Sequence, residues 1–398
     1  MTGLLLAVLT LKPIWSYHAT HWITSMPTVA DGSVYVGTWG GTVLALDATS
    51  GRLRWRSALG ANPDQFYGQT RGVVSSIAVT GRVAYAVSGS CLAGAFDTGT
   101  GRTLWKRRVC SIARNDDTYA TPVVADGVVL IGIDVLGDRP TDRGSIVALD
   151  ARTGTPRWRL FPERYRGSGT GISATPAVDP VRGIAYVGTG NPTPIGSPPA
   201  GPDPYSDSII SFDVHSGRVR WVFGPIHPHD THDRDMFASP NRFTVGTGSR
   251  AREVIGEGGK DGIYYAVDAA DGHLVWRTPV DPADPYASII GSAACGSGLI
   301  FVPVYGGAHG ALVALSQRTG RMRWRASLAG IYEAPALWKG IVFVIGVNGT
   351  LAAFDAADGR RLLTMHVTGR SYGRGPRAQG SRLYVTAGSR VTAYAIWR

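Results

Sequence analysis

The sequence contains little cysteine and little lysine, and each shortage excludes a class of protein. Three cysteines in 398 residues are too few for a disulfide scaffold, and the lack of any C-x-x-C-H motif excludes covalently attached haem. Only four of the 40 basic residues are lysines, and the arginines are dispersed over turns and strand ends. The net charge of +11 therefore does not predict nucleic-acid binding, which needs a concentrated basic surface.

Long apolar runs are also absent. The first 11 residues include a short apolar stretch, but they have neither a positively charged start nor a small-residue cleavage site, so they do not read as a signal peptide. The stretch is shorter than the roughly 20 apolar residues that a membrane-spanning helix needs. We expect no membrane span, and an exported protein would have its true start upstream of Met1.

What is abundant is glycine and proline, with 53 and 24 residues. Together with 44% hydrophobic and 17% charged residues, they favour a large core built from short strands and many turns. All-β closed architectures often keep several hundred residues in one unit. We therefore look for an internal repeat before dividing the chain into domains.

A repeat is present, with the pattern Asp, three residues, Gly, three residues, Trp. The full copies are Asp47/Gly51/Trp55, Asp97/Gly101/Trp105, Asp150/Gly154/Trp158, Asp213/Gly217/Trp221 and Asp268/Gly272/Trp276. Two degenerate copies follow, Ser316/Gly320/Trp324 and Asp355/Gly359/Leu363.

Each copy predicts a β-hairpin. An alternating apolar stretch precedes the Asp, as in residues 43–46, and a second strand ends in the Trp. The Asp side chain caps the turn, the Gly takes the positive φ, and the Trp offers a large apolar area to the next unit. Two further strands precede each hairpin, as in residues 28–29 and 34–37, and four antiparallel strands make a propeller blade.

The two ends of the chain complete one blade. Residues 390–395 form a third strand with no fourth, whereas residues 12–15 form a fourth strand with no hairpin before it. Trp15 then becomes the docking tryptophan of the eighth blade, and the ring closes without an open edge. The prediction is a single all-β, eight-bladed propeller over residues 1–398.

Two of the cysteines flank one predicted hairpin. Cys91 and Cys110 lie almost symmetrically about the turn at residues 97–101, so antiparallel pairing would bring them together. A disulfide there would imply an oxidising compartment. Two buried small residues explain the pair equally well.

Three segments depart from the regular pattern of the repeat: residues 188–194, residues 227–235 and residues 258–262. Successive turns of a four-stranded blade alternate between its two ends. The connections from second to third strand and from one blade to the next therefore share a face, and all three segments fall on it. Loops that depart from a repeat carry function more often than its regular turns.

In these segments the chain resembles the quinoprotein dehydrogenases that bind pyrroloquinoline quinone (PQQ), and in compactness their polyvinyl-alcohol dehydrogenase-like branch. The docking repeat carries the resemblance around the whole ring. It is most specific between Tyr186 and Trp276, where G-T-G-N-P, P-H-D-x-x-D and K-x-G-x-x-Y-x-x-D occur in the order of that family.

The resemblance implies a role for four residues. It makes Asn191 a calcium ligand at the cofactor site and Asp233 both a metal contact and the base that takes the alcohol proton. It makes Lys260 a donor to the quinone oxygens. Arg71 matches an arginine that contacts the cofactor. Such roles suit a tricarboxylate quinone, which needs cationic partners, and a hard Ca²⁺ ion, which needs amide and carboxylate oxygens.

The chain departs from the family pattern in two places. A glutamate calcium ligand expected between Ile131 and Ser145 is missing, and Asp134, Asp138 and Asp142 are its possible replacements. The tryptophan expected to stack under the quinone before Pro176 is also missing. The sequence there reads Gly171-Ile172-Ser173-Ala174.

Each of these residues also has an ordinary structural interpretation. Asn191 with the following proline forms turns, Lys260 suits a solvated turn, and Arg71 suits a loop. The His/Asp-rich residues 227–235 are compatible with a transition-metal site or with a solvated acidic loop. Glu333 reads as a capping or solvated residue.

Two functions follow. The first is a dehydrogenase that oxidises a small or polymeric alcohol with PQQ and Ca²⁺ and passes electrons to a separate acceptor such as a cytochrome. The second is a non-catalytic propeller that acts as a binding or assembly scaffold, similar to the outer-membrane assembly lipoproteins that share this repeat. The resemblance implies an extracytoplasmic location for either.

Overall fold

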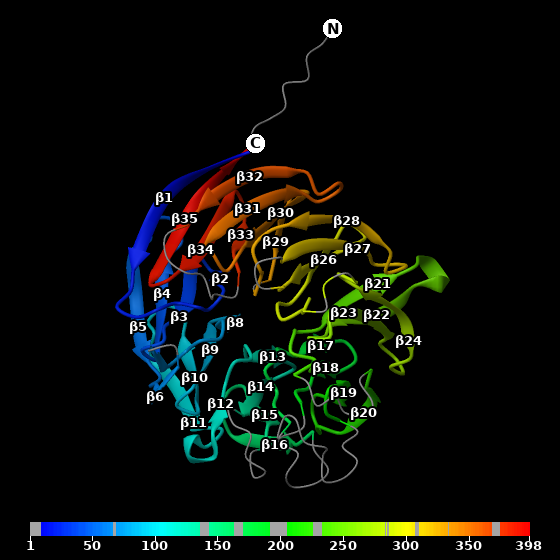
Figure 1. Ribbon diagram of the computed structural model, residues 1–398. Helices are drawn as coiled ribbons and strands as arrows, with labels where there is room; N and C mark the ends of the chain where they lie inside the picture. The colour runs from blue at the N-terminus through cyan, green and yellow to red at the C-terminus, as the bar shows by residue number, and fades with distance from the viewer. Residues whose placement is uncertain are drawn as a thin grey trace.

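The computed structural model describes residues 9–66, 69–135, 143–162, 170–191, 205–225, 233–282, 284, 286–306, 310–332, 334–367 and 375–398. In these residues the chain forms eight antiparallel blades around a central axis (Figure 1). The described part contains no α-helix, and none of its helical turns is long and apolar enough to cross a membrane. The prediction of an all-β, eight-bladed propeller is confirmed.

Every blade runs from a short first strand near the axis to a fourth strand at the rim. Blades 1 to 4 are β2 (Thr28–Ala30), β3 (Ser33–Gly37), β4 (Thr42–Asp47), β5 (Leu53–Ala58); β8 (Ala78–Thr80), β9 (Val83–Ser88), β10 (Leu92–Asp97), β11 (Thr103–Arg108); β13 (Val123–Ala125), β14 (Val128–Val135), β15 (Ser145–Asp150), β16 (Pro156–Leu160); and β17 (Ala177–Asp179), β18 (Ile184–Gly188), β19 (Ile209–Asp213), β20 (Val219–Phe223).

Blades 5 to 8 are β21 (Asn241–Val245), β22 (Arg252–Gly258), β23 (Ile263–Asp268), β24 (Leu274–Pro279); β25 (Ala294–Gly296), β26 (Leu299–Val304), β27 (Ala311–Ser316), β28 (Met322–Ser327); β29 (Ala336–Trp338), β30 (Ile341–Ile345), β31 (Thr350–Asp355), β32 (Arg361–His366); and β33 (Arg377–Gln379), β34 (Arg382–Ala387), β35 (Arg390–Trp397), β1 (Thr10–His18). Outside the blades lie β6 (Asn62–Phe66), β7 (Gln69–Arg71), β12 (Asp116–Asp117) and the 3₁₀ turns η1 (Ile112–Arg114) and η2 (Gly248–Arg250). The second and third strands are buried on both faces, whereas the fourth strands alternate.

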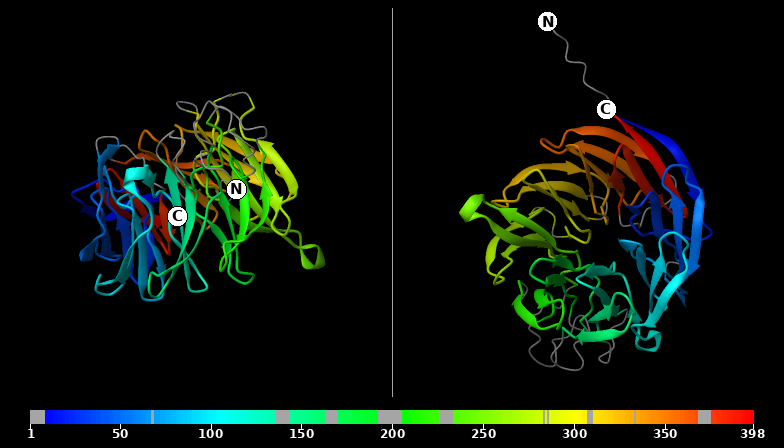
Figure 2. Two further views of the ribbon diagram at one scale, coloured as in Figure 1. Left: turned by 90° about the horizontal axis from the view of Figure 1, so that it is seen from below. Right: turned by 180° about the vertical axis from the view of Figure 1, so that it is seen from behind.

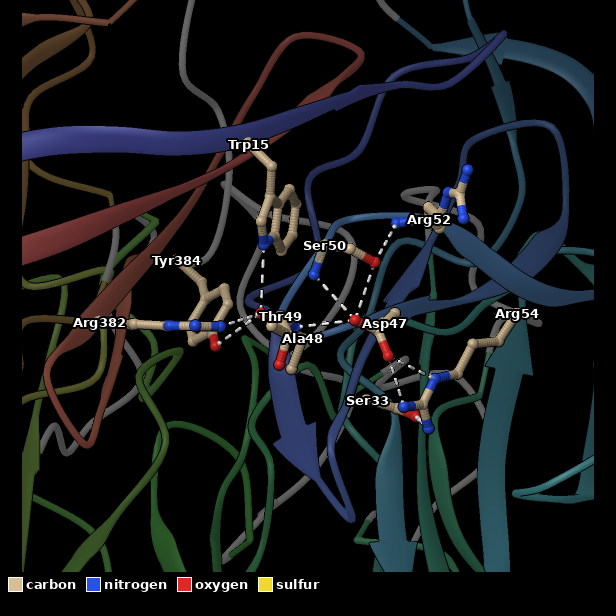
Figure 3. Close-up of polar contacts among 10 residues, drawn as sticks. All are labelled: Trp15, Ser33, Asp47, Ala48, Thr49, Ser50, Arg52, Arg54, Arg382 and Tyr384. Carbon is tan, nitrogen blue, oxygen red and sulfur yellow. Dashed lines mark hydrogen bonds and ion pairs between the residues drawn. The ribbon is translucent and has the colours of Figure 1, made fainter.

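The repeat turn forms as the sequence predicts. In the β4–β5 turn, Oδ1 of Asp47 accepts hydrogen bonds from the backbone N–H groups of Thr49 and Ser50 at 3.0 and 2.8 Å (Figure 3). Gly51 has φ +72°, which glycine adopts without strain. A Cβ at Gly51 would lie 2.5 Å from the ring of Trp15, so this glycine also makes room for the tryptophan of the preceding blade.

Each repeat tryptophan docks on the turn of the next blade. The indole of Trp15 donates to the carbonyl of Ala48 at 3.1 Å (Figure 3). In the next blade, the indole of Trp55 donates to the carbonyl of Thr98 at 2.7 Å. The same hydrogen bond recurs for Trp105, Trp158, Trp221, Trp276 and Trp324. The blades are therefore joined at each of these junctions by one hydrogen bond and by a packed ring, which is buried for Trp55 and Trp105 and half-buried for the other five.

The eighth blade closes as predicted. Strand β1 pairs antiparallel with β35 from Thr10↔Trp397 to His18↔Arg390, with an irregularity between Pro13 and Trp15. Figure 1 and the view from behind in Figure 2 show these two strands side by side at the rim. The N-terminal strand thus supplies the outer strand of the last blade.

The pairing of Cys91 with Cys110 is resolved in favour of a disulfide. Their Cα atoms lie 4.9 Å apart, and the bridge joins the β9–β10 turn to the segment after β11. Cys295 is a free thiol, and burial raises its pKa to about 12. The disulfide holds the start of the connection that leads to β12.

Candidate active site

On one face of the ring, backbone hydrogen bonds join the neighbouring segments that connect the strands. Gly190 N–H donates to Gly171 at 2.9 Å, Met236 N–H to Thr189 at 3.2 Å, and Lys260 N–H to the carbonyl of Asp235 at 3.0 Å. These bonds link the β16–β17, β18–β19, β20–β21 and β22–β23 connections in order. Residues as far back in the sequence as Gly171 are thereby linked to the connection that carries Lys260.

Three of the four predicted site residues meet at this point. Oδ1 of Asp233 accepts hydrogen bonds from Nδ2 of Asn191 and from Nζ of Lys260, each at 2.7 Å. Each residue comes from a different connection, so the contact depends on the fold and not on sequence proximity. The common location of Asn191, Asp233 and Lys260 is as the sequence predicts, whereas their chemical roles remain predictions.

The structure adds Asp235 to this group. Its Oδ1 lies 2.9 Å from Nζ of Lys260, and its Oδ2 accepts a longer hydrogen bond from Asn191 at 3.4 Å. Asp235 is 6% exposed, whereas the side chain of Asp233 is 58% exposed. The D-x-D spacing was the available signal, because two aspartates this close in sequence can both contact Lys260.

Burial and the neighbouring charges shift the pKa values of these groups in opposite directions. Burial raises the pKa of Asp235 to about 6, although Lys260 opposes the shift. Burial also acts on Asp233, but the charge and hydrogen bonds of Lys260 outweigh it and hold the pKa of Asp233 below its ordinary value. Burial would lower the pKa of Lys260, but Asp235 and Asp233 raise it to about 12. At neutral pH the exposed carboxylate is ionised and the lysine is charged.

Arg71, the fourth predicted residue, makes a different ion pair. It ends the extra hairpin β6–β7, and its Nε lies 3.1 Å from Oδ2 of the buried Asp117. A weaker contact at 3.9 Å joins it to Asp64. Asp117 pairs with Asp134 through the backbones of β12 and β14. Among the described residues, the ion pairs of Arg71 are with Asp117 and Asp64 and not with Asp233.

Asp134 is the described member of the three predicted replacements for the missing glutamate. Its Oδ2 accepts a 2.5 Å hydrogen bond from Ser173, and burial raises its pKa to about 6. A Cβ at Gly171 would lie 1.9 Å from its other oxygen. The carboxyl therefore fills the space beside Gly171. Asp138, Asp142, Glu333 and residues 226–232 lie outside the described residues.

A second buried acid was missed by sequence reasoning. Glu257 on β22 is fully buried, and neither carboxyl oxygen has a hydrogen-bond partner among the described residues. A Cβ at Gly188 would lie 1.9 Å from its Oε1. Burial, with the charge of Asp235, raises the pKa of Glu257 well above its ordinary value. An isolated glutamate at an inward strand position gives no sequence signal of its own.

The donor chemistry of the group suits a hard cation. Oδ1 of Asn191 is buried and has no hydrogen-bond partner among the described residues, and it lies on the residue that already contacts Asp233 and Asp235. Amide and carboxylate oxygens are the ligands that Ca²⁺ prefers. No cluster of three or more His, Cys, Asp and Glu suited to a metal occurs in the described residues. A metal site at this point would therefore need the amide oxygen in addition to carboxylate oxygens.

The sequence matches known protein families along most of its length. Residues 7–288 match the family described as glucose/ethanol/alcohol dehydrogenase, beta-propeller domain, with the label PQQ, and residues 259–396 match outer membrane protein assembly factor BamB. Polyvinylalcohol dehydrogenase of a Pseudomonas species is 25% identical over 95% of this chain and 69% of that protein. A quinohemoprotein alcohol dehydrogenase of Pseudomonas putida is 26% identical, but the match spans 41% of its length.

Solved structures show the same fold. The europium-containing methanol dehydrogenase superposes with a TM-score of 0.82 at 16% identity, covering 97% of this chain and 93% of that one. BamB from Moraxella catarrhalis gives a TM-score of 0.69 at 15% identity, covering 97% of this chain and all of that one.

Proposed function

The chain belongs to the PQQ-dependent dehydrogenase β-propeller family, and on that premise we propose that it oxidises an alcohol with PQQ and a bound metal ion. The observation that carries the proposal is the meeting of Asn191, Asp233 and Lys260 on one face, with Asp235 beneath them. A carboxylate base, a metal-binding amide and a cation are the groups that this chemistry needs.

The metal ion would be held by Oδ1 of Asn191 and by the carboxylates of Asp233 and Asp235. Ca²⁺ suits these oxygen ligands. A trivalent lanthanide is the other candidate, because the europium-containing neighbour has the same fold and two carboxylates here share one site. In either case the positive charge would offset the cost of burying Asp235.

The cofactor would be held by positive charge. Lys260 and Arg71 supply cations for a tricarboxylate quinone, and Lys260 is already positioned beside the metal ligands. PQQ, when bound, supplies the two-electron acceptor for the alcohol. The missing stacking tryptophan is a difference from the expected family pattern, since Gly171 packs against Asp134 where the ring was expected.

Asp233 is the residue for the proton of the alcohol. It is exposed, ionised at neutral pH and hydrogen-bonded to both Asn191 and Lys260, which fix its orientation. An ionised carboxylate at an open position can take a proton from a bound hydroxyl group. Asp235 is too buried for this role and instead supports Lys260 and the metal.

The electrons would leave to a separate acceptor such as a cytochrome, because the sequence has no motif for attached haem. The Cys91–Cys110 disulfide supports an oxidising, extracytoplasmic location. The substrate would be a small or polymeric alcohol.

A scaffold function is the second candidate. It is favoured by the match of residues 259–396 to BamB and by the absence of a stacking tryptophan at residues 171–174. A pure scaffold, however, has no need for a carboxylate, an amide and a lysine assembled from three connections. The two functions predict opposite results in cofactor binding.

The test is a titration of the purified protein with PQQ, with and without Ca²⁺ or La³⁺, followed by absorbance of the bound cofactor and then by dye reduction with simple alcohols. We expect metal-dependent binding that Asn191→Ala or Asp233→Ala weakens by more than about tenfold. Asp271→Ala is the matched control, because Asp271 is exposed on the opposite face. A wild-type protein that binds no PQQ at millimolar metal contradicts the enzyme and favours the scaffold.

A further inference from the structure

Glu257 reaches from blade 5 into the layer between blades 4 and 5. It lies on β22, and its side chain extends to Gly188 at the end of β18 in the neighbouring blade. Ile255 and Tyr265 lie on the same face of the sheet, and together with Met236 they belong to one buried apolar cluster. A carboxylate in such a layer has no water to solvate it.

Two oxygen atoms share the space beside Gly188. The point where a Cβ at Gly188 would stand lies 1.9 Å from Oε1 of Glu257 and 2.3 Å from the carbonyl oxygen of Met236. An ionised carboxylate and a carbonyl only accept hydrogen bonds, so these two atoms repel each other unless a donor is present. Neither carboxyl oxygen of Glu257 has a partner among the described residues. A proton on Glu257 turns the repulsion into a hydrogen bond.

The positive charge in this part of the protein is shared by two other acids. Nζ of Lys260 lies 2.7 Å from Asp233 and 2.9 Å from Asp235. Burial raises the pKa of Glu257 well above its ordinary value, and the negative charge of Asp235 adds to that effect. Ionising Glu257 would place a further negative charge in an apolar layer, at a cost that its protonated form avoids.

The two tyrosines on the adjoining strand β23 do not supply the missing donor. The hydroxyl of Tyr264 donates to Oδ1 of Asn241 at 3.2 Å, and the hydroxyl of Tyr265 donates to Oδ2 of Asp261 at 2.5 Å. Burial raises the pKa of both tyrosines, so both keep their protons. The proton between the two oxygens therefore has to come from Glu257 itself.

We propose that Glu257 is a positioning residue, which keeps its proton at neutral pH and donates it to the carbonyl oxygen of Met236. Met236 directly follows Asp235, and its N–H already donates to Thr189 at 3.2 Å. A second hydrogen bond, at its carbonyl, holds the end of the segment that carries Asp233 and Asp235 against blade 5. The hydrogen bond is independent of the proposed function, whereas its effect on metal binding rests on that function.

Infrared spectroscopy in D₂O tests the proton directly, without metal, cofactor or turnover. A protonated carboxyl group has a C=O band separate from those of carboxylates and of the backbone. At pH 8 Asp134 and Asp235 are ionised, because their pKa values are about 6. We expect a protonated-carboxyl band at pH 8 that Glu257→Gln removes. Glu253→Gln is the matched control and leaves the band, because Glu253 lies on the same strand and pairs with Arg242 at 3.3 Å.

Metal binding tests the positioning. Glu257→Gln keeps a donor for the carbonyl of Met236, whereas Glu257→Leu fills the space without one. In calorimetric titrations of the purified protein with La³⁺, we expect Glu257→Leu to bind about tenfold more weakly and Glu257→Gln to bind like the wild type. A residue that only fills space predicts no such rescue by glutamine.

The inference is overturned if the wild type shows no protonated-carboxyl band at pH 8, if the band survives Glu257→Gln, or if the two variants bind La³⁺ alike. A wild type that shows the band but binds no La³⁺ contradicts the proposed function and leaves the protonated glutamate established.

Discussion

Asp235→Asn is expected to stabilise the metal-free protein, which is the opposite of the usual effect of a buried substitution. Asp235 is 6% exposed, and burial raises its pKa from 3.8 to about 6. At intermediate pH the folded protein therefore keeps a proton on Asp235 that the unfolded chain has already lost. The neutral amide has nearly the same shape and carries no such cost.

The size of the effect follows from that difference in pKa. Below the unfolded pKa of 3.8, Asp235 is protonated in both states and its ionisation costs no stability. As the pH rises from 3.8 through about 6, the unfolded chain ionises more readily than the folded protein, so the free energy of unfolding decreases. Above that range the cost in free energy of unfolding reaches about 3 kcal/mol. At pH 5 it is about half as large, because most folded molecules still carry the proton.

The assay is urea unfolding at pH 8 and pH 5 in the presence of a chelator, with Asp271→Asn as an exposed control. We expect Asp235→Asn to gain up to about 3 kcal/mol at pH 8 and clearly less at pH 5. Adding Ca²⁺ or La³⁺ should stabilise the wild type and not the variant. A variant less stable than wild type at pH 8, or an advantage that grows toward pH 5, refutes the reasoning.

Two further outcomes concern the ring. Trp105→Ala removes a ring packed on Gly154 and should cost about 3 to 5 kcal/mol in denaturant unfolding, whereas exposed Trp397→Ala should change stability by less than about 0.5 kcal/mol. A loss below about 1 kcal/mol for Trp105→Ala would contradict docking. Replacing Cys91 and Cys110 by serine should lower the melting temperature, with a loss of about 2 to 4 kcal/mol, and equal melting of oxidised and reduced protein would contradict a structural role.

The ring could be predicted because its signal is repeated. The Asp, Gly and Trp of each turn act locally and against the next blade, so seven copies determine the number of blades. Trp15 before any hairpin, together with a third strand at residues 390–395 that has no fourth, was enough to predict closure by β1. Local chemistry repeated many times is a strong basis for prediction.

The site could be predicted only in part. Asn191, Asp233 and Lys260 follow strand ends on one face, and strand parity is a reliable guide to the face. The partner of Arg71 could not be predicted, because Asp117 reaches it through the extra strand β12. Glu257 was missed because its burial depends on the space left by Gly188 in a neighbouring blade. Contacts between blades are set by packing rather than by spacing along the chain.

The pairing of β1 with β35 also sets an order of events during synthesis. At about 5 to 20 residues per second, His18 is synthesised roughly 20 to 75 s before its partner Arg390. During that time the first strand has an unpaired edge. Lys12 and Pro13 lie on it, and both residue types discourage pairing with a wrong strand. Strand β1 thus carries the protection that it needs until its partner β35 has been made.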